Sequence, residues 1–106
     1  MISVDIKADE AGVQYVISGH AMSAEPGKDI VCAGLSTLTD TLANMAERFR
    51  DEGLTDVCIV QQGDGFSHVF IKTYGNQAMA AALDAITIMY SQFADQYPDY
   101  VSLHLL

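Results

Sequence analysis

Hydrophobic and polar residues alternate in two short segments near the start of the chain, residues 2–7 and 13–17. Alternation with a period of two is typical of a β-strand that buries one of its faces. The residues between these segments, Asp9 to Gly12, are of the types that form turns. We therefore predict an N-terminal β-hairpin that ends near Gly19.

A helical pattern comes next, because apolar residues then recur at steps of three and four. Gly53 stands where the C-terminal stop of this helix is expected. Asp29 is the best candidate for the N-cap, which makes Ile30 the first helical residue. The apolar stripe of this predicted helix consists of Val31, Leu35, Leu38, Leu42, Met45 and Phe49.

The second half of the chain repeats the same kinds of pattern. Residues 56–60 and 66–71 flank a Gly-Asp-Gly turn, which predicts a second hairpin. A second amphipathic helix follows and is closed by Pro98, before a final strand over residues 101–105. Its apolar stripe consists of Met79, Leu83, Ile86, Tyr90, Phe93 and Tyr97.

These elements predict one domain over residues 1–106 with the order ββαββα and a terminal β-strand. Two amphipathic helices on one face of a mostly antiparallel sheet form a two-layer sandwich of the α+β class. Half of the residues are hydrophobic, which suffices for one core in a chain of this length.

The charge balance excludes some classes of partner. Fourteen acidic residues against five basic ones give a formal charge of −9, which repels nucleic-acid phosphates and anionic lipid and attracts basic partners. The longest apolar run, residues 78–90, contains Asp84 and is too short to span a membrane. With no leader pattern either, we expect a cytoplasmic protein that binds neither nucleic acid nor membranes directly.

The cysteines are too few for a disulfide framework or a metal site. Cys32 and Cys58 are the only two, and no CxxC pair or histidine-rich tract accompanies them, so we expect no metal and no cofactor. Cys58, in an apolar strand, is expected to be a core or interface thiol. His68 and His104 fall on strands and are expected to be solvated or hydrogen-bonded there.

His20 and Cys32 have the layout that a cysteine nucleophile needs. The histidine follows a predicted strand, and the cysteine falls in the first turn of a predicted helix. A thiol attacks as the thiolate, which a nearby imidazole and a helix N-terminus both favour. Backbone amides around Cys32 are the candidate donors for the oxyanion of an attacked carbonyl.

The segment that contains both residues, Gly19 to Leu38 with the sequence GHAMSAEPGKDIVCAGLSTL, resembles the signature of the ribosomal-processing cysteine protease family called Prp. Members pair a G-H-A segment with a D-I-V-C-A segment across a short loop. The resemblance implies a homodimeric cysteine endopeptidase that removes the N-terminal extension of large-subunit ribosomal protein twenty-seven during ribosome maturation.

The resemblance also implies roles for individual residues. His20 is the base, Cys32 is the nucleophile and Asp29 is a supporting acid. From the residues alone, Asp29 either orients the imidazole or caps the helix, and capping is the favoured interpretation. The loop between the pair is the expected substrate loop, with Met22 and Ser23 where the family usually has glycine and an aromatic residue; its candidate residues are Gly19, Ala21, Met22, Ser23 and Gly27.

Two other functions remain open from the sequence. The first is a non-catalytic binding or assembly module of the same fold, linked to ribosome biogenesis, in which Cys32 is structural. The second is a redox sensor, which requires the fold to bring Cys58 within about 7 Å of Cys32 between α-carbons.

Overall fold

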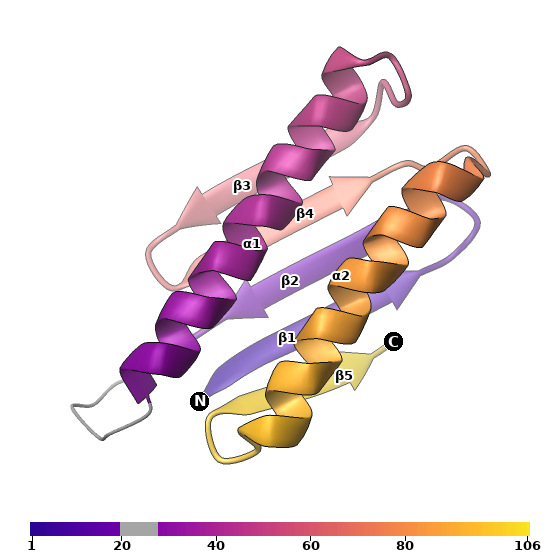
Figure 1. The fold of residues 1–106 in the computed structure, drawn as a ribbon. Helices are drawn as coiled ribbons and strands as arrows, with labels where there is room; N and C mark the ends of the chain where they lie inside the picture. Colours follow the sequence, from indigo (N-terminus) through magenta and orange to yellow (C-terminus); the bar gives the residue numbers. More distant parts are fainter. Residues whose placement is uncertain (20–27) are drawn as a thin grey trace.

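The structure is a computed structural model that describes residues 1–19 and 28–106, and the side chains of the second range from residue 30 onward. Figure 1 shows two helices lying side by side across one face of a sheet. The elements are β1 (Ile2–Ala8), β2 (Val13–Ser18), α1 (Lys28–Asp51), β3 (Cys58–Gly63), β4 (Phe66–Ile71), α2 (Gln77–Gln96) and β5 (Val101–Leu105).

The sheet has five strands in the order β3-β4-β2-β1-β5. All neighbouring strands are antiparallel except β1 and β5, which pair in parallel with Ile2 opposite Val101. Helix α1 packs on β3 and β4, and α2 packs on β5. The predicted α+β sandwich, with both helices on one face of a mostly antiparallel sheet, is therefore confirmed.

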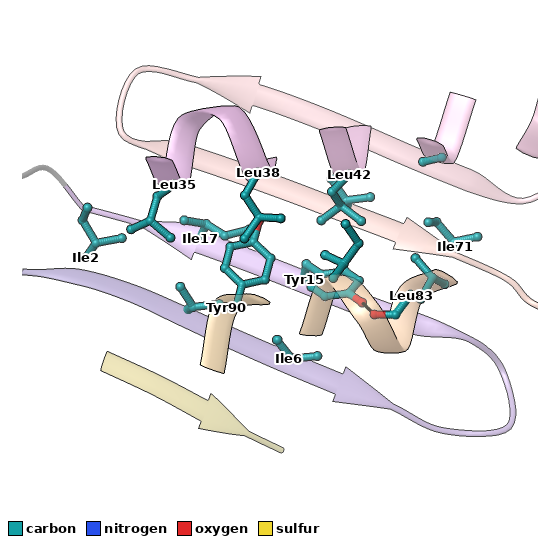
Figure 2. Close-up of a cluster of buried hydrophobic side chains, with 14 of the residues drawn as sticks. Ile2, Ile6, Tyr15, Ile17, Leu35, Leu38, Leu42, Ile71, Leu83 and Tyr90 are labelled. Carbon is teal, nitrogen blue, oxygen red and sulfur yellow. Dashed lines mark hydrogen bonds between the residues drawn. The ribbon is translucent and has the colours of Figure 1, made fainter. Parts of the chain in front are cut away.

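The hydrophobic core fills the space between the helices and the sheet (Figure 2). The strand residues predicted to face inward, such as Val4, Tyr15 and Val69, are completely buried. The two predicted helical stripes also face the core, fully buried at positions such as Leu42 and Leu83 and half-buried toward the C-terminal end of each helix. Removing apolar surface from water stabilises a fold by about 25 cal/mol per Å². The burial of these side chains is therefore the main force that holds the two layers together.

Two element boundaries differ from the sequence-based expectation. Strand β3 begins at Cys58 rather than at residue 56, because the Val57 N–H donates to the Thr55 hydroxyl at 3.3 Å and not to a neighbouring strand. Helix α1 begins at Lys28 rather than at Ile30. Lysine has a good intrinsic helix propensity, so a capping preference alone does not decide where such a helix starts.

Helix α2 has a capped N-terminal end and stops where the sequence predicted. The Asn76 side chain accepts a hydrogen bond from the Met79 N–H at 2.9 Å, and the helix stops before Pro98. Within the described ranges, no helix combines the length and the apolar character needed to cross a lipid bilayer.

Candidate active site

A cleft of about 510 Å³ opens at the N-terminal end of α1. Its walls are the first turns of α1, the turn between β3 and β4, and the ends of β1 and β2 at Ile2 and Ile17. The cleft is therefore built by segments from three separate parts of the chain. It is large enough to hold several residues of a peptide, since ligand pockets are commonly of about 300–1,000 Å³.

Cys32 lines this cleft from α1 and is half-buried. Leu35, Ser36 and Thr39 line it from the following turns of the same helix, because residues three, four and seven positions on share one helical face. The thiol is thus accessible from the cleft while its helix is fixed by the core below.

The observed start of α1 changes which backbone amides near Cys32 have hydrogen-bond partners within the helix. With Lys28 as the first helical residue, Asp29 is the second residue of the helix and not the residue before it, so the predicted N-cap position is corrected. Cys32 is then the fifth helical residue, and its amide reaches the carbonyl of Lys28 in the regular helical pattern. The Cys32 amide is therefore not a free donor for an oxyanion, contrary to our expectation, whereas the amides up to Ile30 lack helical partners.

His20, the predicted base, lies outside the described residues, as do the predicted loop residues Ala21, Met22, Ser23 and Gly27. Gly19, which directly precedes His20 in the sequence, lines the same cleft as Cys32. Its N–H donates to the Gly65 carbonyl at 2.9 Å, which ties the end of β2 to the β3–β4 turn.

The two described histidines lie elsewhere. His68 is on the sheet face opposite the helices, with its ring nitrogens 3.2 Å from the side-chain oxygens of Gln61 and Gln14. His104 on β5 contacts Asp5 through Nδ1 at 2.9 Å. Neither of these two lines the cleft, so neither competes with His20 as the partner of Cys32.

Cys58 has the structural role expected of it. It is half-buried against the core on β3, and burial raises the pKa of its thiol, which keeps it protonated and unreactive near neutral pH. The charges of Arg50 and Glu47 on α1 act on this thiol. Cys58 therefore lies near the Glu47 end of α1, and Glu47 is about 22 Å along this helix from Cys32. The two cysteines are too far apart for a disulfide, so the redox-sensor hypothesis is wrong.

The far wall of the cleft holds residues that the sequence did not point to. Asp40 on α1 accepts a hydrogen bond from the Gln62 side-chain amide at 3.3 Å, and Asp64 lies in the β3–β4 turn. The segment around Asp64 is recognisable in the sequence only as a hairpin turn. Its place at the cleft depends on the pairing of β4 with β2, and no local pattern predicts that pairing.

One cleft residue is anchored in the core. The buried Thr39 hydroxyl and the Tyr90 hydroxyl of α2 are hydrogen-bonded at 2.8 Å, and burial raises the pKa of Tyr90 to about 12. Tyr15 lies beside Tyr90 with ring centroids 6.0 Å apart. The hydrogen bond between Thr39 and Tyr90 holds the cleft side of α1 against α2.

Among the described residues, no group of histidine, cysteine and acidic side chains is arranged to hold a metal ion.

The family model described as cysteine protease Prp matches residues 1–102 of this chain. The chain belongs to the Prp cysteine protease family. The predicted enzyme class, a cysteine endopeptidase, is therefore confirmed. The comparison with curated protein sequences gives no significant match.

Similar solved structures, two of them of a Prp protease, agree with this assignment. A crystal structure of the essential ribosomal processing protease Prp from S. aureus with a covalently linked product peptide has a TM-score of 0.74 and 28% identity, over 100% of both chains. The same S. aureus protease with a substrate peptide gives 0.76 and 27%, again over 100% of both chains. SMU.848 from Streptococcus mutans gives 0.73 and 25%, over 100% of this chain and 94% of that one.

Proposed function

We propose that this Prp-family protein removes the N-terminal extension of large-subunit ribosomal protein twenty-seven during ribosome maturation, with Cys32 as the nucleophile and His20 as the base. The observation that carries the proposal is the position of Cys32. In a chain that belongs to a cysteine protease family, Cys32 lines a cleft of peptide size, whereas Cys58 does not line it, although both thiols are half-buried beside the core.

The chemistry follows from the residue types. His20 takes the proton of the Cys32 thiol, and the thiolate sulfur attacks the scissile carbonyl carbon to form a tetrahedral oxyanion. The C–N bond then breaks, His20 gives its proton to the leaving amine, and the acyl group stays on Cys32 as a thioester. Water, deprotonated by His20, attacks this thioester, which releases the acid product and returns the thiol.

The start of α1 supports the oxyanion. The N-terminal end of a helix favours negative charge placed against its free amides. The amides in the first turn, up to Ile30, have no partner inside the helix and are the remaining backbone candidates for the oxyanion donors. Asp29 belongs to the same turn, and in this proposal it is the supporting acid.

A ribosomal substrate is supported by likeness and by charge. The S. aureus relatives are ribosomal processing proteases that were solved with a product and a substrate peptide. This chain has a formal charge of −9, and the N-terminal tails of ribosomal proteins are basic, so the two attract each other. Ribosome maturation places this enzyme in the cytoplasm.

The active protein is a homodimer in this proposal. The sheet face opposite the helices is not covered by any described element (Figure 1). The strand registers place the apolar residues Val16, Ile59 and Phe70 on this face. Ile59 is 40% exposed in the single chain. Packing this face against a second copy removes apolar surface from water.

The decisive experiment is incubation of the purified protein with ribosomal protein twenty-seven that still has its N-terminal extension, with product masses as the readout. We expect cleavage at one peptide bond by the parent protein and by the Cys58→Ala variant. The Cys32→Ala and His20→Ala variants are expected to leave the substrate intact.

Labelling with iodoacetamide at mildly acidic pH separates the alternatives. In the proposed enzyme, Cys32 reacts much faster than Cys58, whose raised pKa leaves little thiolate at that pH. Selective labelling of Cys32 without cleavage means that the substrate is a different protein. Slow and equal labelling of both cysteines without cleavage contradicts the proposal and favours the non-catalytic module.

A further inference from the structure

The acidic wall of the cleft suggests which peptides the site prefers. Among the described residues that line the cleft, two are carboxylates, Asp40 and Asp64, and none is lysine or arginine. We propose that Asp40 is a specificity-determining residue that binds the basic side chain of a lysine or arginine in the substrate peptide. This inference rests on the proposed function of the cleft.

The position of Asp40 on α1 sets the distance to the reacting bond. Cys32, Ser36 and Asp40 follow one another at steps of four along the helix and all line the cleft. Asp40 therefore lies about 12 Å along the helix axis from Cys32. An extended peptide covers this distance in about three or four residues. The preferred basic residue is therefore three or four positions from the scissile bond.

The surroundings of Asp40 leave it able to bind a cation. Its Oδ1 accepts from the Gln62 side-chain amide at 3.3 Å, which is a neutral partner and orients the carboxylate without neutralising it. Asp40 is exposed to solvent, so a substrate ammonium or guanidinium group can reach it. The formal charge of −9 on the whole chain adds to the attraction of a basic peptide.

The test uses quenched fluorescent peptides that span the extension junction of ribosomal protein twenty-seven, with every native basic residue replaced by glutamine. One position at a time then carries lysine, norleucine or glutamate. For the parent protein, we expect lysine at one position three or four residues from the scissile bond to raise kcat/KM about two- to fivefold over norleucine, as for an exposed ion pair. Added salt should reduce this preference.

The variants assign the preference to Asp40. In Asp40→Asn the ratio of the lysine to the norleucine peptide should fall to about one, and Asp40→Lys should prefer glutamate at the same position. Asp51→Asn is the matched control, since it removes a carboxylate from the far end of α1, and it should keep the parent ratio. Because each result is a ratio within one variant, partial loss of folded protein does not change it.

The outcomes separate this inference from the function on which it rests. A parent protein that cleaves these peptides with no positional preference for lysine overturns the role of Asp40 alone. A preference for lysine that persists in Asp40→Asn also overturns the role of Asp40. A parent protein that cleaves neither these peptides nor the full ribosomal protein overturns the proposed function, and the specificity inference fails with it.

Discussion

Gly19 has a backbone geometry that a side chain does not fit. Its φ angle is +105°, in the region that favours glycine, and a Cβ atom would lie 2.3 Å from the backbone oxygen of Met1. The sequence analysis named Gly19 as a candidate residue of the substrate loop, and that role stays a prediction. The geometry gives a separate reason for a glycine at the end of β2, where the chain passes close to Met1 and lines the cleft.

We expect Gly19→Ala to lower the free energy of unfolding by at least about 2 kcal/mol, because positive φ and a backbone clash both oppose the side chain. Gly53→Ala is the matched control: its φ is +78°, but nothing lies within 4 Å of the added carbon. That variant should lose only about 1 kcal/mol. Urea unfolding measures both values, and equal losses would contradict the clash with Met1.

The chemical role of a residue could be predicted from the sequence only where the groups that act together lie close to one another along the chain. Cys32 stands out because one segment contains the thiol, a helix start and the preceding histidine. Asp40 and Gln62 do not stand out, since they are 22 residues apart and meet only in the folded chain. The sequence therefore pointed to the cysteine that lines the cleft and did not point to the acidic residues of its wall.

At the level of elements, α1 and α2 are joined by a buried hydrogen bond between hydroxyl groups. The Tyr90 hydroxyl has a pKa of about 12 because it is buried, whereas a tyrosine in an unfolded chain has a pKa of about 10. Between these values the unfolded state has lost this proton and the folded state has kept it. The folded state therefore becomes less stable as pH rises through this range.

We expect the free energy of unfolding to fall by about 1.4 kcal/mol per pH unit between pH 10 and 12 on account of Tyr90. The pKa of Tyr15 is also raised by burial, which steepens the loss. Urea unfolding at a series of pH values gives the slope. Tyr90→Phe should have a shallower slope and be less stable at pH 8 by about 1 kcal/mol, since the Thr39 hydroxyl loses its partner. An unchanged slope would contradict this assignment.

Element types could be predicted from periodicity, whereas two element starts could not. The helices are marked by repeated apolar positions that the core buries, and many residues contribute to that signal. The start of β3 depends on one hydroxyl, that of Thr55, and the start of α1 lies two residues before the expected one. Single-residue competition of this kind leaves no periodic pattern to detect.

At the level of the whole molecule, the uncovered sheet face is the expected dimer interface. Phe70→Glu places a charge on that face, between Ile59 on β3 and Gln14 on β2, and should convert the dimer to a monomer. Ile88→Glu is the control, because Ile88 is an apolar residue on α2 that is 54% exposed. Light scattering at micromolar concentration measures the mass, and a monomeric parent protein would contradict the homodimer.

The order of strands in the sheet was beyond the reach of the sequence. Hairpins join neighbours in the chain, so β1–β2 and β3–β4 follow from their turns. The contacts β2–β4 and β1–β5 join distant segments, and they are decided by which arrangement buries both helical stripes at once. The cleft lies where these long-range contacts bring its walls together, which is why its full outline required the structure.

The pairing of β1 with β5 has a consequence for the course of folding. Ile2 lies opposite Val101, and its N–H donates to the Tyr100 carbonyl at 2.8 Å, so this ladder closes a loop of nearly the whole chain. Closing so long a loop costs the most conformational entropy, and contacts of this kind form late. Ile2 is also a wall of the cleft. A partly folded molecule therefore lacks a complete cleft, and proteolytic activity arises only with the last step of folding.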